Sequence, residues 1–115
     1  MKEIVINTRY GGFSLSRRAI EYARQKGYRW ALECPIYAGE KYTDGSVYDG
    51  TFNNTFFPDV SRDNPELIEV VKTLGTKANG DSASLKIVEI PDDAKDWYID
   101  EYDGKEVIRE GRVWD

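Results

Sequence analysis

Two adjacent glycines, Gly11 and Gly12, separate a run of residues typical of a β-strand from a run typical of an α-helix. Apolar side chains alternate along residues 3–9, which predicts a first strand. Ser14 or Ser16 can cap the helix that follows, in which apolar residues recur at helical spacing. Paired glycines adopt backbone angles that other residues avoid. The sequence therefore predicts a strand, a sharp turn and a helix, in that order.

The segments after this helix are predicted as a strand and a long loop. Gly27 follows the first helix and predicts its end. Residues 28–33 are predicted as a second strand that packs beside the first one. Residues 35–62 are predicted as an irregular segment with one short hairpin. The many aromatic side chains of this segment suggest a functional loop or a contact between subunits.

A second helix begins near residues 63–66, whose sequence Asp-Asn-Pro-Glu supplies a cap, a first-turn proline and a first-turn acid. Apolar residues then recur at helical spacing as far as residue 78. The Asn-Gly pair at 79–80 is predicted to end this helix as a left-handed stop. Gly75 lies inside the apolar pattern and lowers helix stability, so it is predicted to mark close packing.

Three further strands complete the predicted fold. Residues 84–90 form one strand, and residues 97–102 and 105–114 flank Asp103-Gly104, the strongest hairpin signal in the chain. The resulting order is β-α-β, loop, α-β-β-β. A chain of 115 residues has the usual length of one domain. The sequence therefore predicts a single α+β domain, residues 1–115, with a mostly antiparallel sheet and two helices.

The composition excludes several classes of enzyme. The sequence has no histidine and one cysteine, Cys34. It therefore lacks the residues for serine–histidine or cysteine–histidine catalysis, for an internal disulfide, for a structural zinc site and for an iron–sulfur cluster. We expect no catalytic residues, no metal site and no cofactor. A carboxylate-based enzyme or, more simply, a binding protein is consistent with this composition.

The net charge of −5 is unevenly distributed along the chain. Residues 1–30 hold seven basic and two acidic residues, a net of +5, whereas residues 31–115 hold nine basic and nineteen acidic residues, a net of −10. An acidic chain is a poor binder of long nucleic acids, which need dense Lys and Arg. The basic segment can hold a small anion, or it can pair with acidic strands within the chain or between subunits.

The sequence gives no indication of a membrane partner. No apolar run approaches the ~18 residues of a membrane span, and the N-terminus lacks the layout of a signal peptide. Together with the free thiol, these features favour a cytoplasmic protein.

The glycine turn is the first candidate binding site. Tyr10, Gly11, Gly12 and Phe13 form this turn, and Arg17 lies in the first turn of the helix. A turn before a helix presents backbone N–H groups at the positive end of the helix dipole, which suits phosphate. Arg17 opposes that dipole, and a bound anion would offset the cost. The alternative is that the glycines only make a tight turn and that the arginine is solvated or paired.

The second candidate is the C-terminal pair Arg109 and Arg112. On a regular strand these residues point to opposite faces, but a bulge at Gly111 would direct both guanidinium groups toward one pocket. The planar guanidinium fork binds phosphate in a bidentate manner. A third cluster, the carboxylates between residues 92 and 106, is interpreted as a solvated acidic face that could imitate a DNA backbone.

Several motifs occur together in this chain. They are Val5-Ile6-Asn7, Tyr10-Gly11-Gly12-Phe13-Ser14-Leu15-Ser16, Arg62-Asp63-Asn64-Pro65-Glu66-Leu67, Gly75, Ala78-Asn79-Gly80, Leu85-Lys86-Ile87-Val88-Glu89-Ile90-Pro91-Asp92, Ile99-Asp100-Glu101-Tyr102-Asp103-Gly104, Arg112 and Trp114. Taken together they resemble small phage proteins of the Thoeris anti-defence 1 type. The resemblance spans nearly the whole chain except residues 28–60, and its most specific part is the string from 85 to 104.

The resemblance implies an anti-defence sponge in the host cytoplasm. Such a protein binds cyclic ADP-ribose isomers made by TIR-domain proteins, or cyclic oligonucleotides, and sequesters them without cleavage. It also implies a homo-oligomer, a dimer or a hexamer, with ligands held between subunits. Aromatic rings such as Phe13 would stack on adenine, and arginines would hold the pyrophosphate. From chemistry and motif position, the predicted ligand-binding residues are Tyr10, Gly11, Gly12, Phe13, Arg17, Asn79, Arg109 and Arg112.

Two other functions remain open at this stage. One is an acidic DNA mimic, or another protein-binding inhibitor of a host defence enzyme. The other is a carboxylate-dependent phosphodiesterase or hydrolase.

Overall fold

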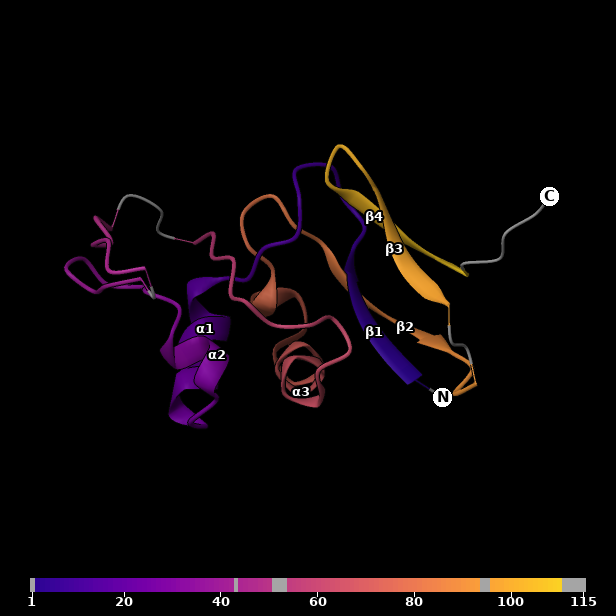
Figure 1. Ribbon diagram of the computed structural model, residues 1–115, viewed down its shortest axis with the longest axis horizontal. Coiled ribbons are helices and arrows are strands. Elements are labelled where there is room, and N and C mark those ends of the chain that lie inside the picture. The colour runs from indigo at the N-terminus through magenta and orange to yellow at the C-terminus, as the bar shows by residue number, and fades with distance from the viewer. Residues whose placement is uncertain (1, 43, 51–53, 94–95, 111–115) are drawn as a thin grey trace.

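Helices gather at one end of the molecule and strands at the other in the computed structural model (Figure 1). The structure describes residues 2–42, 44–50, 54–93 and 96–110. The predicted α+β class is confirmed, because the chain forms one compact body of antiparallel strands and helices. No helix in these described ranges is long and apolar enough to cross a membrane.

The strands form two antiparallel pairs rather than one sheet. β1 (Lys2–Asn7) pairs with β2 (Leu85–Ile90), so segments from distant parts of the sequence lie side by side. β3 (Trp97–Tyr102) and β4 (Lys105–Glu110) form the second pair. The predicted strands at 3–9, 84–90 and 97–102 are therefore confirmed. The predicted last strand is confirmed as far as residue 110, and the rest of it lies outside the described residues.

Both long helices begin at the side-chain caps expected from the sequence. α1 (Arg17–Gln25) begins at Ser16, whose hydroxyl accepts a hydrogen bond from the N–H of Ala19. α3 (Pro65–Leu74) begins at Asn64, whose side-chain oxygen accepts from the N–H of Glu66 at 2.7 Å. These bonds satisfy backbone donors that lack a partner inside the helix.

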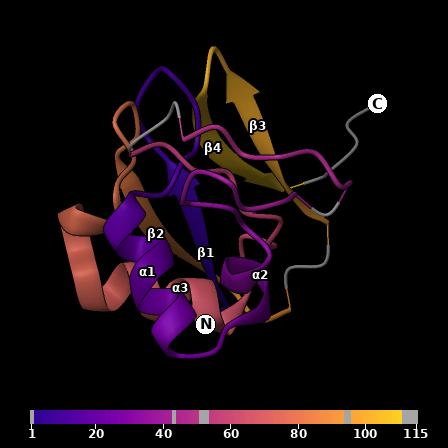
Figure 2. The ribbon, with the colours of Figure 1, turned by 90° about the vertical axis from the view of Figure 1, so that its left-hand side faces the viewer.

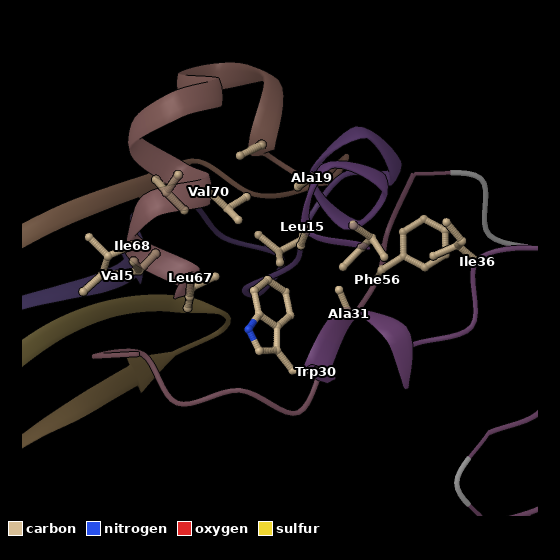
Figure 3. Packing of buried hydrophobic residues seen from close by; sticks show 14 of the residues in the cluster. Val5, Leu15, Ala19, Trp30, Ala31, Ile36, Phe56, Leu67, Ile68 and Val70 are labelled. Atoms are coloured by element: carbon tan, nitrogen blue, oxygen red, sulfur yellow. The ribbon is translucent and has the colours of Figure 1, made fainter. Parts of the chain in front are cut away.

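The core lies where α1, α3 and β1 meet. Leu15, Leu67 and Val70 are fully buried there, and Val5 of β1 joins them. Figure 3 shows the indole of Trp30 directed toward Leu15 and Leu67. Figure 2 shows the β3–β4 hairpin on the opposite side of β1 from the helices.

The prediction of a strand at residues 28–33 is wrong. Residues Arg29–Leu32 form a short helix, α2, that packs against α1. Trp30 and Ala31 are neighbours in sequence and both are buried, a pattern that a half-exposed strand does not produce. The indole N–H of Trp30 donates to Glu66 at 3.0 Å, which ties α2 to α3. Consequently the partner of β1 is β2, and not the segment that follows α1.

Gly75 and Gly80 have exchanged the roles predicted for them. α3 ends at Leu74, and Gly75 terminates it with a φ of 57° before a short 3₁₀ turn, Gly75–Ala78. No other atom lies within 4 Å of a Cβ built on Gly75, so close packing is not its role. At Gly80 a Cβ would instead collide with the side chain of Ser14. Gly80 is therefore required for the close approach of two chain segments.

The long segment 35–62 contains the short hairpin that was predicted. Its turn surrounds Gly45, which has a φ of 91°, and the N–H of Tyr42 donates to the carbonyl of Ser46 at 2.8 Å. A single bridge joins Lys41 and Val47. Asp44 accepts from both the hydroxyl and the N–H of Ser46, and these bonds lower the pKa of its carboxyl group.

The tip of the β3–β4 hairpin rests on the glycine turn after β1. Asp103 and Gly104 have φ angles of 53° and 90°, as expected of the predicted Asp-Gly turn. The N–H of Gly11 donates to the carbonyl of Asp103 at 3.1 Å. A Cβ on Gly104 would collide with the backbone nitrogen of Gly12. The glycines therefore allow two backbone turns to lie in direct contact.

This contact predicts a large cost for Gly104→Ala. We expect the free energy of unfolding to fall by about 3 kcal/mol or more, because the backbone strain of a positive φ adds to the collision with Gly12. The matched control is Gly27→Ala, since Gly27 has a φ of 80° but no atom within 4 Å of the added Cβ. This control should cost about 1–2 kcal/mol. Equal losses in urea denaturation would contradict the packed-turn interpretation.

Candidate functional site

A hollow of about 390 Å³ opens between the glycine turn, the hairpin tip and the end of the long loop. We call it the hairpin hollow. Its walls are Gly12, Phe13, Phe57, Pro58, Asp59, Val60, Arg62, Glu101, Gly104 and Glu106. Its volume lies in the range of pockets that bind small ligands.

A stacked cation and ring form one wall of the hairpin hollow. The guanidinium carbon of Arg62 lies 3.7 Å from the centre of the Phe13 ring. Both nitrogens of the Arg62 fork donate to the carboxylate of Glu106, at 2.5 and 2.8 Å. This bidentate pair fixes the plane of the guanidinium, so the stack is held in place before any ligand arrives.

Glu106 connects the hairpin to the edge of β1. Glu106 is 6% exposed, and one of its carboxylate oxygens accepts from the N–H of Asn7 at 2.8 Å. Along the same edge, the N–H of Val5 donates to the carbonyl of Arg62 at 2.9 Å. Glu106 lies on β4 with Ile108 on the face that is turned toward β1. The carboxylate therefore takes the place of a neighbouring strand at the β1 edge.

The side chain of Asn7 forms hydrogen bonds to three chain segments beside the hairpin hollow. Its side-chain N–H groups donate to the carbonyls of Arg9 and Gly104, at 2.6 and 2.7 Å. Its side-chain oxygen accepts from the N–H of Ser84 at 2.8 Å. Asn7 is fully buried, so these bonds satisfy a side chain that would otherwise be costly to enclose.

The charge of the hairpin hollow is negative. Among the described residues that line it, Arg62 is the only basic one, and Asp59, Glu101 and Glu106 are acidic. The Arg62–Glu106 pair is internally neutral, which leaves two uncompensated carboxylates. The stack of Phe13 and Arg62 suits a flat, uncharged ring such as a nucleobase. A phosphate group is not attracted by the residues of this hollow alone.

Four of the predicted site residues are brought together near the hairpin tip. Gly12 and Phe13 line the hairpin hollow, and Gly11 binds the turn through its N–H. Tyr10 is 56% exposed beside them, with its ring 5.6 Å from the ammonium of Lys105.

Backbone N–H groups at the start of α1 already donate to acceptors from this chain. The N–H of Arg17 donates to the side chain of Asn54 at 3.1 Å, and Ser16 accepts from the helix as its cap. The Arg17 guanidinium donates to the carbonyl of Ile36 at 3.1 Å and lies 4.6 Å from the centre of the Tyr37 ring. The structure therefore favours the alternative in which Arg17 is paired within the chain.

Asn79 and Arg109 lie apart from the hairpin hollow. The side-chain oxygen of Asn79 accepts from the N–H of Leu85 at 2.9 Å, which fixes the start of β2. Arg109 lies on the face of β4 opposite Glu106 and pairs with Asp100 at 2.6 Å. Arg112 is outside the described residues.

The sequence interpretation missed Arg62 and Glu106 as partners. Glu106 was counted with the solvated carboxylates. A usable signal was its position two residues after the Asp103-Gly104 turn, on the same strand face as Ile108. A carboxylate on an inward-facing strand position needs a cation or several N–H donors. Nothing local in the sequence identifies Arg62 as that cation.

Comparison with known proteins gives no relative. A comparison with protein-family models finds no match, and searches of curated proteins and of solved structures find none either. Within the described ranges, no group of three or more His, Cys, Asp or Glu side chains is arranged to hold a metal ion.

The burial of Glu106 predicts unequal effects for two carboxamide variants of the hairpin. Glu106→Gln removes the charge that compensates Arg62, and we expect a loss of about 3 kcal/mol in the free energy of unfolding. Asp100→Asn removes the exposed pair with Arg109 and should cost less than about 1 kcal/mol. Chemical denaturation of both variants measures the difference. A Glu106→Gln protein as stable as Asp100→Asn would show that the buried pair does not anchor the hairpin.

Proposed function

We propose that this chain binds a cyclic ADP-ribose-type signal, or a cyclic oligonucleotide, and sequesters it without cleavage. The resemblance of its motifs to the Thoeris anti-defence 1 type motivates this proposal. The observation that carries it is the Phe13–Arg62 stack beside the hairpin hollow. In this proposal the protein acts in the host cytoplasm during phage infection and depletes an immune signal.

The adenine base of the ligand would pack against Phe13 and Arg62, which are already stacked on each other. An adenine ring entering the hairpin hollow meets Phe13, Phe57 and the guanidinium of Arg62. Because Glu106 already fixes the guanidinium plane, less side-chain freedom is lost when the base binds. Gly12 carries no side chain, and no atom lies within 4 Å of a Cβ built on it, so a sugar ring can approach the backbone closely there.

The phosphates of the ligand would need cations from elsewhere. The hollow has more carboxylates than basic groups, whereas residues 1–30 carry a net charge of +5. Arg18 is exposed on α1 and makes no ion pair with the described residues. We therefore place the basic N-terminal part of a second copy near the hollow, in a homo-oligomer such as a dimer or a hexamer.

The acidic-mimic function has one observation in its favour. Asp100, Glu101 and Asp103 are all exposed on the β3–β4 hairpin. Arg109 neutralises Asp100, however, and Lys105 lies on the same short hairpin. The unpaired negative charges on this hairpin are therefore less regularly spaced than the phosphates of a DNA backbone. For this reason we favour sequestration of a nucleotide signal over DNA mimicry.

Ligand release after denaturation tests the proposed function directly. The protein is incubated with a panel of cyclic ADP-ribose isomers and cyclic oligonucleotides, filtered and then heated. We expect chromatography to recover one class of ligand intact from the denatured protein. Recovery of an altered compound would indicate an enzyme. If every compound of the panel stays in the filtrate at micromolar protein, sequestration of these signals is excluded.

A pair of aromatic variants locates the retained ligand. Phe13→Leu removes the ring beneath Arg62 while keeping an apolar side chain, and retention should fall about tenfold. Tyr102→Leu is the matched control, because Tyr102 is 78% exposed and does not line the hairpin hollow. It should retain the ligand as the parent protein does. A similar loss in both variants would place the site elsewhere.

Native mass spectrometry tests the need for a second copy. We expect a dimer or a hexamer at micromolar concentration, with ligand bound to the oligomer.

Raised salt concentration should weaken the retention of ligand by the protein, since the phosphate contacts in this proposal are ionic. Ligand bound stoichiometrically to a monomer would contradict a site shared between subunits.

A further inference from the structure

A second hollow, with different chemistry, lies between α2 and residues 55–59. We call it the aromatic hollow, and its volume is about 280 Å³. Five of the described residues that line it are aromatic: Trp30, Tyr42, Tyr48, Phe56 and Phe57. It shares Phe57, Pro58 and Asp59 with the hairpin hollow, but no residue of the glycine turn or of the hairpin lines it.

The rings of the aromatic hollow form a fixed base and a more exposed mouth. Trp30, Tyr48 and Phe56 are each less than a tenth exposed. Trp30 and Phe56 come from separate segments of the chain and both belong to the buried core (Figure 3). Tyr42 meets Tyr48 edge to face at 6.1 Å between ring centres, and it is 43% exposed. Phe57 is 70% exposed, although an aromatic ring of this size is usually covered in a monomer.

The charged side chains that line the aromatic hollow are acidic, and basic side chains lie next to it. Among the described residues, Glu33 and Asp59 line it and no Lys or Arg does. Arg24 lies next to it, where its guanidinium donates to the carbonyl of Cys34 at 2.7 Å and pairs with Glu40. Cys34 also lines it, and burial raises the pKa of this thiol to about 11, so the thiol is neutral near pH 7. Arg29 pairs with Glu33 at 3.5 Å but is largely exposed. Ring faces and carboxylates both attract a cation, and both disfavour phosphate.

We propose that the aromatic hollow binds an organic cation of the quaternary ammonium class. A methylated ammonium group carries its charge on an apolar surface, so aromatic faces can enclose it at little desolvation cost. Asp59 supplies the compensating carboxylate at the rim. This site adjoins the nucleotide site proposed at the hairpin hollow and shares Phe57, Pro58 and Asp59 with it, but the proposal does not depend on that function.

Choline and its carbon isostere dimethylbutanol distinguish a cation site from a merely apolar one. Binding to the full chain is measured by calorimetry and by saturation transfer to the ligand methyl protons. We expect saturable binding of choline, at least about threefold tighter than binding of dimethylbutanol. Equal affinities, tighter binding of adenosine, or no saturable binding of choline would each overturn the proposal.

Exposed residues provide variants that keep the fold. Asp59→Asn and Tyr42→Leu should each weaken choline binding about threefold or more, while thermal unfolding stays close to that of the parent. Tyr98→Leu is the matched control, since Tyr98 is 48% exposed on β3 and does not line the hollow. Undiminished choline binding in both hollow variants would overturn the proposal even if the parent binds choline.

Discussion

The ion pair between Arg62 and the buried Glu106 attaches the β3–β4 hairpin to the rest of the structure. A two-stranded hairpin is marginally stable by itself in water. The β3–β4 hairpin gains its support through Glu106, which accepts from Arg62 and from the backbone of Asn7. A buried carboxylate is tolerated only when its charge and its lone pairs are satisfied, and here both conditions are met. The wall of the hairpin hollow is a direct product of this arrangement, because the same pair positions Arg62 over Phe13.

Local signals allowed much of the fold to be predicted from the sequence. The caps at Ser16 and Asn64 and the turn at 103–104 each depend on a few neighbouring residues, and the structure confirms all three. The segment 28–33 was misassigned because its conformation depends on distant partners. Trp30 binds Glu66 of α3, and this tertiary contact outweighs the weak strand preference of the segment. The roles of Gly75 and Gly80 were exchanged because spacing alone does not show which chain passes close to a glycine.

The candidate site was predicted in part for the same reason. Gly11, Gly12 and Phe13 were found because a glycine turn before a helix is a local pattern. The partner of Phe13 is Arg62, which is far from it in sequence, and no short motif connects them. Arg17 and Arg109 were predicted to contact a ligand because a sequence shows charge without its partners. In the structure the carbonyl of Ile36 and the carboxylate of Asp100 take up their guanidinium groups.

The covering of the β1 edge has a consequence for how copies of this chain can associate. An open strand edge invites another strand, and repeated addition leads to extended β-aggregates. Along β1 the outward N–H groups of Val5 and Asn7 are already bound to the carbonyl of Arg62 and to the carboxylate of Glu106. A neighbouring molecule therefore cannot continue the sheet at this position. At this edge, two copies of the chain can therefore associate only through side chains and not through the addition of a strand.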